Sequence, residues 1–150
     1  MDETFVFGPA LIEAHELEQD KGGPRWPCVA VTDVVAELSR EMARSYYATP
    51  TQSPFARELM VDDQGTVFVD HLGLWLDEED DPRVIEYWAP RYRDLIRRKL
   101  KELPRGRVWD KWRWLGDYHD HALRLRRQNR RHFVTGLRAQ HGFTRFSDTI

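Results

Sequence analysis

The chain has 150 residues, 41% hydrophobic and 32% charged, a composition that excludes a disordered or fibrous protein and indicates one globular domain. Its single cysteine, Cys28, excludes a disulfide within the chain and fits a reducing compartment, so we expect a cytoplasmic location. No run of about 18 apolar residues occurs, so the sequence predicts no membrane-spanning helix and no membrane partner.

The formal net charge of −2 hides a strong asymmetry along the chain. Residues 1–82 hold 18 acidic and 5 basic residues, a balance of −13, and residues 83–150 hold 7 acidic and 18 basic residues, a balance of +11. This division is compatible with an acidic body that carries a nucleic-acid-binding tail. It is equally compatible with two halves that attract each other, within one chain or across a dimer.

The first predicted elements lie in the stretch FVFGPALIEAHELE, residues 5–18. It is typical of a short apolar strand, a Gly-Pro hinge and an amphipathic helix, because proline is well tolerated at the first helical position. Ala10, Ala14 and Leu17 recur at helical spacing and form a narrow apolar face. These small residues predict a helix that packs closely against a sheet.

A second strand and helix are predicted after the turn at Gly22-Gly23-Pro24. Residues 27–32 form a short apolar run that predicts a buried strand, and Thr32 or Asp33 is placed to cap a helix. The apolar face of this helix is predicted to consist of Val35, Leu38, Met42 and Tyr46. The segment ATPTQSP, residues 48–54, is predicted to be a loop.

A hairpin is predicted next, with strands over residues 55–61 and 66–72. The intervening sequence Asp-Asp-Gln-Gly suits a tight turn between them. The acidic run DEEDD, residues 77–81, is predicted to be a solvated loop. It lacks the alternating ligand spacing and the glycine of a calcium-binding loop.

Two long helices are predicted in the second half of the chain. The first begins at Pro82 and ends at Pro104, and Pro90 is expected to kink or divide it. The second is expected to begin near Val108 and to run to about Gln140. Its apolar stripe is predicted to consist of Val108, Trp112, Leu115, His119 and Ala122.

Two of these stretches carry a resemblance to a known family. Residues 5–18 resemble the W-G-D-x-V-N-x-A-x-R-x-E pattern of class III nucleotidyl cyclases, with Phe7-Gly8, Ala14 and Glu18 on matching positions. They are still more similar to a set of bacterial cyclase-like proteins of obscure function. The run WRWLGDYHDH, residues 112–121, resembles a K-Y-x-W-L-x-x-Y-H-N signature in the tail of that set.

The resemblance implies a fold and a domain division. We expect an α/β fold in which residues 1–76 form the C-terminal, ferredoxin-like half of a cyclase-type domain. The order of elements in that half is strand, helix, strand, helix and hairpin. Residues 77–150 are expected to form a helical C-terminal extension, which consists of a pair of helices.

The same resemblance identifies three substituted positions in the nucleotide pocket. Active cyclases use an Asp, an Asn and an Arg for base, ribose and phosphate, and these positions hold Pro9, Ile12 and Glu16 here. Isoleucine cannot hydrogen-bond a ribose, and a carboxylate repels a triphosphate where the transition state needs positive charge. The sequence therefore predicts no catalytic residues, no metal and no cofactor.

Two functions remain open from the sequence. The first is a degenerate nucleotidyl cyclase-like domain with a signalling, nucleotide-binding or dimerisation role, which is not catalytic alone. The alternative is a nucleic-acid-binding module that uses the basic C-terminal run, for which no reading helix or zinc finger is visible. That run comprises Arg124, Arg126, Arg127, Arg130, Arg131 and His132.

Local groups of reactive or metal-binding side chains give little further support to either function. Asp117 and His121 lie four residues apart on one helix face and offer only an edge of a metal site, which needs three or four ligands. Cys28 lies in an apolar strand, where a thiol is usually inert. No nucleophile elbow and no phosphate-binding loop are present.

Partners are expected from the charge division and from the thin predicted sheet. The basic C-terminal helix is expected to dock on acidic surface of the first half, or of a second copy, with Trp112 and Leu115 supplying most of the attachment. A sheet of few strands leaves an exposed edge, so we expect a homo-oligomer or a missing N-terminal half that completes the domain.

Overall fold

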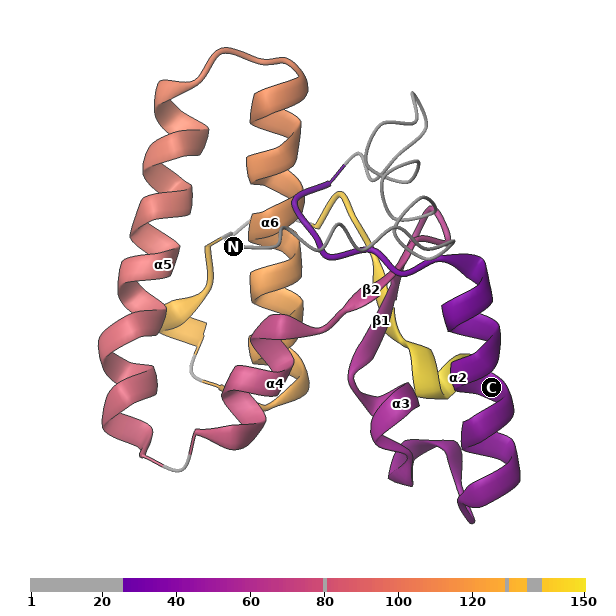
Figure 1. Cartoon of the computed structure of the whole chain (residues 1–150). Helices are drawn as coiled ribbons and strands as arrows, with labels where there is room; N and C mark the ends of the chain where they lie inside the picture. The colour runs from indigo at the N-terminus through magenta and orange to yellow at the C-terminus, as the bar shows by residue number, and fades with distance from the viewer. Residues whose placement is uncertain (1–25, 80, 129, 135–138) are drawn as a thin grey trace, which may run out of the picture.

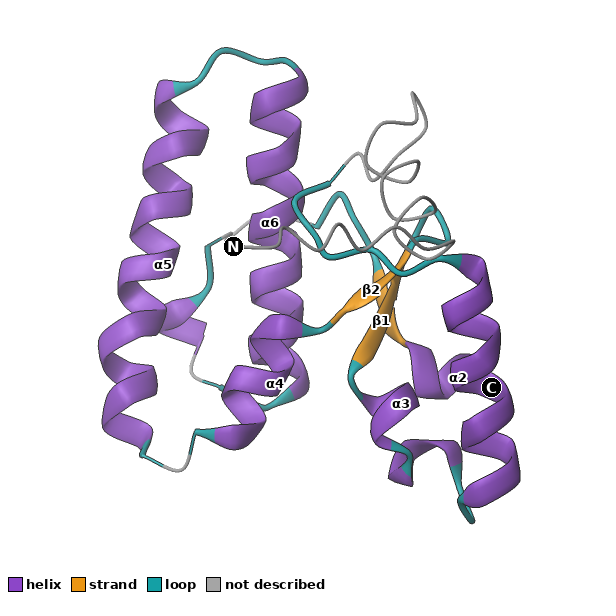
Figure 2. Ribbon diagram, viewed as in Figure 1, coloured by secondary structure: helices purple, strands orange, loops and turns teal. Residues whose placement is uncertain are grey.

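The structure is a computed structural model that describes residues 26–79, 81–128, 130–134 and 139–150. The described part combines α-helices with a small antiparallel sheet, as expected for a mixed α/β chain (Figures 1 and 2). The strand and helix predicted within residues 5–18 lie outside the described residues. None of the described helices is both long and apolar enough to cross a membrane.

Three short strands form the sheet in the order β2-β1-β3, with β1 at Leu59–Asp62, β2 at Val67–Val69 and β3 at Phe143–Arg145. The hairpin of β1 and β2 confirms the sequence prediction, and β3 is a strand that the sequence did not indicate. The turn is stabilised by the Asp62 carboxylate, which accepts hydrogen bonds from the backbone N–H groups of Gln64 and Thr66.

Both predicted hairpin strands are too long at their outer ends. The segment Pro54–Arg57 is helix α3, and the segment His71–Glu78 is helix α4. Proline at the first helical position favours α3, and the Asp70 side chain caps α4. The expected domain boundary after residue 76 falls inside α4, and the division into two domains stays a prediction.

The predicted strand over residues 27–32 is reduced to a single bridge between Ala30 and Phe68. Backbone hydrogen bonds of 2.9 Å join Val31 N–H to the Val67 carbonyl and Val69 N–H to the Val29 carbonyl. The strand prediction is therefore wrong in extent. The Thr32 side chain already caps the next helix, so few residues remain for pairing.

Helix α2, Asp33–Tyr46, begins where the capping residue predicts, with Thr32 accepting from Val35 N–H. Its predicted apolar face is wrong, because the buried residues are Ala36 and Ala43. These alanines pack with Ala56, Leu59 and Phe146. Small side chains allow the closest approach between the helix and the sheet, so they decide which face is buried.

The two faces of the sheet hold different parts of the core. Met60 and Phe68 pack on one face with the side chains of helix α6, in a cluster that also contains Trp26, Trp114, Tyr118 and Phe143. Leu59 and Val67 lie on the opposite face, which α2 and α3 cover. This alternation is the period of two that a strand imposes on its side chains.

The predicted helical pair consists of α5, Pro82–Glu102, and α6, Arg107–Leu125, which lie side by side in Figure 1. Pro90 lies inside α5, and the helix is not divided there. Helix α6 ends at Leu125 rather than near Gln140, because the chain turns back to pair β3 with β1. Three 3-10 turns complete the described part: η1 at Pro50–Gln52, η2 at Arg130–His132 and η3 at Phe146–Thr149.

Cys28 packs against the sheet–α6 cluster. Burial, together with the nearby Asp62 carboxylate, raises the pKa of the Cys28 thiol to about 11. Because only the thiolate reacts, we expect a disulfide reagent such as DTNB at pH 8 to modify the folded chain on the order of a hundredfold more slowly than the urea-unfolded chain. Equal rates in the two states would contradict this placement.

Candidate ligand-binding site

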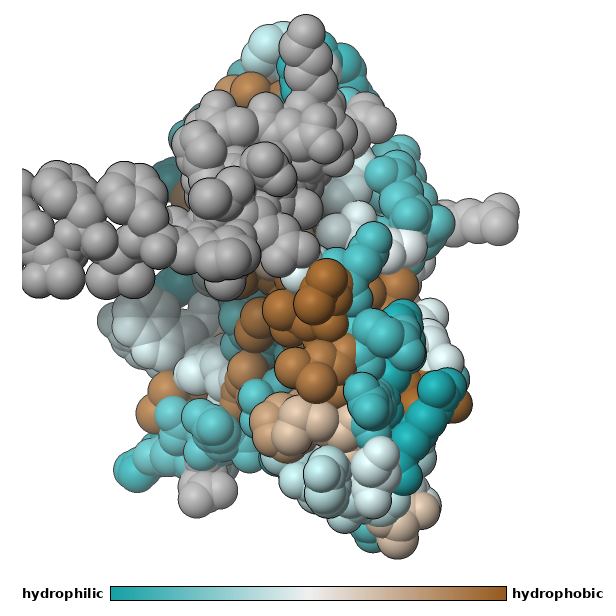
Figure 3. Space-filling model, turned by 45° about the vertical axis from the view of Figure 1, so that its right-hand side comes forward, coloured by the Kyte–Doolittle hydropathy of each residue, from teal (hydrophilic) through white to brown (hydrophobic). Residues whose placement is uncertain are grey.

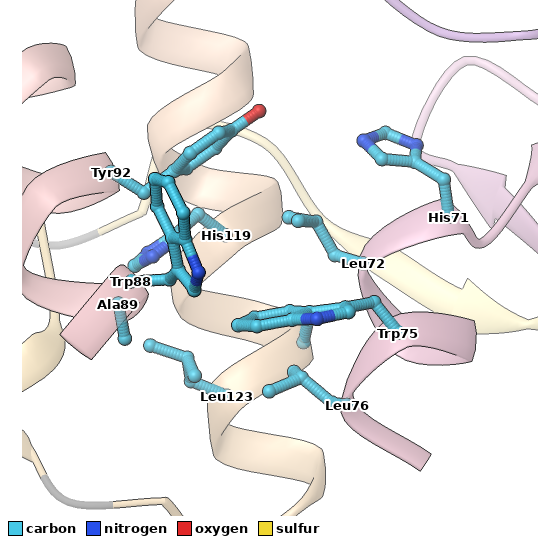
Figure 4. Close-up of a pocket in the computed structure, with 10 residues that line it drawn as sticks. His71, Leu72, Trp75, Leu76, Trp88, Ala89, Tyr92, His119 and Leu123 are labelled. Atoms are coloured by element: carbon cyan, nitrogen blue, oxygen red, sulfur yellow. The ribbon is translucent and has the colours of Figure 1, made fainter. Parts of the chain in front are cut away.

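A pocket of about 360 Å³ opens between helices α4, α5 and α6 (Figure 4). Its walls combine aliphatic and aromatic side chains with two histidines. Figure 4 shows how Trp75 and Leu76 come from α4, while Trp88 and Tyr92 come from α5. The lining residues are His71, Leu72, Trp75, Leu76, Trp88, Ala89, Tyr92, His119, Ala122 and Leu123.

A buried polar cluster at Asp70 fixes α4 against α6. The carboxylate of Asp70 accepts hydrogen bonds from Gly73 N–H at 3.1 Å and from the Tyr118 hydroxyl at 2.6 Å. Arg126 contacts the second carboxylate oxygen at 3.4 Å. A side chain at Gly73 would collide with this cluster, because its Cβ would lie 2.0 Å from Asp70 Oδ2. The cluster therefore sets the position of the α4 side chains in the pocket.

The Tyr118 hydroxyl both donates and accepts. It donates to Asp70 and accepts from Leu72 N–H at 3.1 Å. Burial and the Asp70 carboxylate raise the pKa of Tyr118 above its ordinary value, so the phenol stays neutral. The neutral Tyr118 hydroxyl thus links the Asp70 carboxylate to the first turn of α4.

His119 is the most buried polar residue of the pocket wall, with 3% of its surface exposed. Its ring stacks on Tyr92 at a centroid distance of 5.7 Å, and its Nδ1 lies 3.3 Å from Asp120 Oδ1. A carboxylate only accepts, so this contact favours a proton on Nδ1 and leaves Nε2 as an acceptor in the neutral ring. Within the described part of the chain, Nε2 of His119 makes no hydrogen bond.

Burial also acts on two other polar groups of the pocket wall, His71 and Tyr92. Burial lowers the pKa of His71, although a backbone hydrogen bond with Val69 and the Asp70 carboxylate act in the other direction. Burial raises the pKa of Tyr92. Among the described residues, the lining contains no Lys, Arg, Asp or Glu side chain. The site therefore suits an uncharged molecule with flat apolar faces and one hydrogen-bonding group.

The sequence-predicted site positions fall elsewhere. Pro9, Ile12 and Glu16 lie outside the described residues. Asp117 is one of the two residues that could have formed an edge of a metal site. It accepts hydrogen bonds from Arg113 and from the backbone N–H groups of Gln140 and His141. Its carboxylate is therefore occupied by the protein itself. Among the described residues, no group of three potential ligands is placed to hold a metal ion.

The basic C-terminal run is engaged with acidic side chains of the same chain. Arg126 pairs with Asp77 at 2.7 Å, and His132 Nε2 lies 3.2 Å from Glu86, which also contacts Arg131. Arg126 therefore contacts acidic surface of the first half, as predicted, whereas Arg131 and His132 contact Glu86 of the second half. The expected anchor is wrong, because the fully buried tryptophan of α6 is Trp114 and not Trp112.

Sequence reasoning missed this pocket because it assigned His71 and Leu72 to a strand. It also assigned Trp88, Tyr92 and His119 to apolar packing faces. A signal was present in the spacing of Asp70 and Gly73, since an aspartate that caps a helix accepts from a backbone N–H two or three residues on. This spacing predicts a helix that begins at His71, and such a helix would place Trp75 near α6.

Comparison of the chain with protein-family models, with curated proteins and with solved structures yields no match.

Proposed function

We propose that this protein is a non-catalytic, cyclase-like binding domain whose pocket between α4, α5 and α6 takes a small planar aromatic or heteroaromatic molecule. The observation that carries the proposal is a pocket with aromatic walls whose described lining holds no Lys, Arg, Asp or Glu, together with one buried histidine, His119, that has a free ring nitrogen within the described structure. A signalling role would follow from occupancy of this pocket rather than from turnover.

The size and polarity of the pocket define the ligand class. A volume of about 360 Å³ lies at the lower end of the range for small-molecule sites, so it suits a molecule of one or two fused rings. Trp75 and Trp88 offer ring faces for stacking. A phosphate group would lose its hydration without gaining a cation from the described part of the lining, which holds no Lys or Arg. A nucleoside base therefore fits this chemistry better than a nucleoside triphosphate.

The relation to cyclases remains part of the proposal. It is supported by the likeness of residues 5–18 and 112–121 to the family patterns and by the order of α2 and the β1–β2 hairpin. We interpret the sheet as the ferredoxin-like half of such a domain. The alternative of nucleic-acid binding has less support, because Arg126, Arg131 and His132 already pair with acidic side chains.

Calorimetric titration of the full chain with indole, adenosine and ATP tests the proposal. We expect indole and adenosine to bind and ATP to bind no more tightly than adenosine. Trp88→Ala removes a half-exposed aromatic side chain from the pocket wall. It should weaken indole binding about tenfold, as expected for loss of an aromatic stacking partner. Tyr46→Ala, an exposed aromatic residue outside the pocket, is the matched control and should leave binding unchanged.

Benzothiophene probes the role of His119, because it has the shape of indole without the N–H donor. Loss of one neutral hydrogen bond should weaken binding roughly threefold to tenfold. Failure of both indole and adenosine to bind at millimolar concentration would overturn the proposal. So would ATP binding that is unaffected by Trp88→Ala and falls steeply with added salt, since that pattern indicates a phosphate site elsewhere.

A further inference from the structure

The connection between α5 and α6 carries a dense group of cations, which we call the basic tip. It spans residues 98–111, which hold six basic and two acidic residues, a balance of +4. Figure 1 shows this connection at the opposite end of the helical pair from α4. Figure 3 shows hydrophilic residues at the same upper end of the molecule, whereas the largest apolar patch in that view lies near the middle. The six cations are Arg98, Lys99, Lys101, Arg105, Arg107 and Lys111, all exposed except the partly buried Lys99.

The charge of the basic tip is not neutralised by the described part of the chain. No carboxylate among the described residues forms an ion pair with any of the six cations. The basic C-terminal run differs in this respect, because Arg126, Arg131 and His132 pair with Asp77 and Glu86. The basic tip is therefore a separate surface from that run, and its positive charge faces outwards.

Two contacts of Trp109 fix the shape of the basic tip. The indole Nε1 of Trp109 donates a hydrogen bond of 2.9 Å to the Leu100 carbonyl, which joins the start of α6 to the end of α5. The Arg105 guanidinium lies over the Trp109 ring, with its Cζ 3.6 Å from the ring centroid. The cations are therefore presented on two joined helix ends, and less conformational freedom is lost when a partner binds.

The side chains around the cations disfavour two kinds of anionic partner. Within residues 98–111, all of which the structure describes, Val108 is the only large apolar residue that is exposed. The one aromatic residue of the tip, Trp109, is 7% exposed. Surfaces that bind anionic bilayers combine their cations with exposed Trp, Phe or Leu side chains. Proteins that bind single-stranded nucleic acid expose aromatic rings on which bases stack. The basic tip offers neither feature.

The acidic surface near the start of α5 is a poor partner for the basic tip of a second copy, because its carboxylates are already paired. These ion pairs join Asp77 to Arg126, Asp81 to Arg83 and Glu86 to Arg131. The same acidic end lies far from the tip within one chain, since the 21 residues of α5 span about 30 Å. The Debye length is about 8 Å at physiological ionic strength, so the acidic end does not cancel the field of the tip.

We propose that the basic tip binds the phosphate backbone of double-stranded nucleic acid without reading its base sequence. Two helices side by side are roughly 20 Å across, wider than the major groove of about 12 Å, so the tip lies over the groove and contacts phosphates on both of its edges. Arg105 and Arg107 add guanidinium groups, which can bind a phosphate through two hydrogen bonds. The pocket between α4, α5 and α6 uses no residue of the tip, so this inference is independent of the proposed ligand.

Fluorescence anisotropy of a labelled DNA duplex of about 20 base pairs, titrated with the full chain, tests the inference. We expect micromolar binding at about 50 mM salt, equal for two unrelated sequences. Binding should weaken on the order of a hundredfold at about 200 mM salt, as expected when four or five phosphates release their counterions. The variant Lys101→Gln/Arg107→Gln/Lys111→Gln should reduce the slope of log K against log salt by about three and weaken binding at about 50 mM salt at least thirtyfold.

The variant Arg124→Gln/Arg127→Gln/Arg130→Gln is the matched control. It removes the same charge from exposed positions at and beyond the other end of α6, and it should change duplex binding by less than about threefold. Far-UV circular dichroism and thermal melting establish that both variants keep the fold.

Several outcomes would contradict the inference. Absence of duplex binding at about 500 μM protein and about 50 mM salt overturns it, as does an equal loss of binding in the two triple variants. Tighter binding to a single strand than to the duplex overturns the contact with both edges of the groove. Capture of the chain by vesicles that contain phosphatidylserine, without duplex binding, overturns nucleic acid as the partner.

Discussion

Replacing Trp114 by alanine should lower the free energy of unfolding by about 3–5 kcal/mol, the range for removal of a fully buried large aromatic side chain. Trp114 has no exposed surface and lies at the centre of the cluster between the sheet and α6. Its ring lies 5.3 Å from that of Phe68 and 5.2 Å from that of Phe143. The ring therefore joins α6 to strands β2 and β3, and alanine would leave a cavity among all three elements.

Urea unfolding followed by far-UV circular dichroism measures this loss. Trp112→Ala is the matched control, because Trp112 lies on the same helix and is only partly buried. We expect the control to cost less than half as much, since part of its ring already contacts water. An equal or larger effect of Trp112→Ala would show that the anchor suggested by the sequence is the correct one.

The second large effect is expected at Asp117. Its side chain has no exposed surface and accepts two hydrogen bonds from Arg113, at 3.1 and 3.2 Å. The same carboxylate accepts the backbone N–H groups of Gln140 and His141, which lead into β3. Asp117→Ala should cost about 3–5 kcal/mol, because it removes the carboxylate that compensates a buried guanidinium.

A double variant separates the cost of an uncompensated buried charge from the cost of the lost hydrogen bonds to the backbone. Asp117→Leu/Arg113→Met replaces the buried pair by apolar side chains and should be more stable than Asp117→Ala alone. Asp148→Ala, at an exposed position near the C-terminus, serves as the control and should change stability by less than about 0.5 kcal/mol. If Asp117→Ala matched that control, the carboxylate would not hold the C-terminal segment in solution.

Local signals in the sequence determined several element boundaries. Thr32 defines the start of α2 because its hydroxyl oxygen accepts a backbone N–H that the helix leaves unpaired. Pro82 and Pro104 bound α5 for a similar local reason, since proline lacks an N–H and suits a helix start better than a helix interior. The hairpin turn after Asp62 depends only on neighbouring residues. Each of these features forms within a few residues, so the sequence alone predicts it.

Only the tertiary structure decided which faces are buried and where the chain turns back. The alternation of Val35 and Leu38 with polar residues predicts an amphipathic α2, but the close approach of Ala36 and Ala43 to the sheet determines its buried side. The end of α6 depends on the pairing of β3 with β1, which joins segments about eighty residues apart. The pocket likewise requires α4, α5 and α6 together. Contacts at such separations are chosen by the sum of burial over the whole core, which no short stretch of sequence contains.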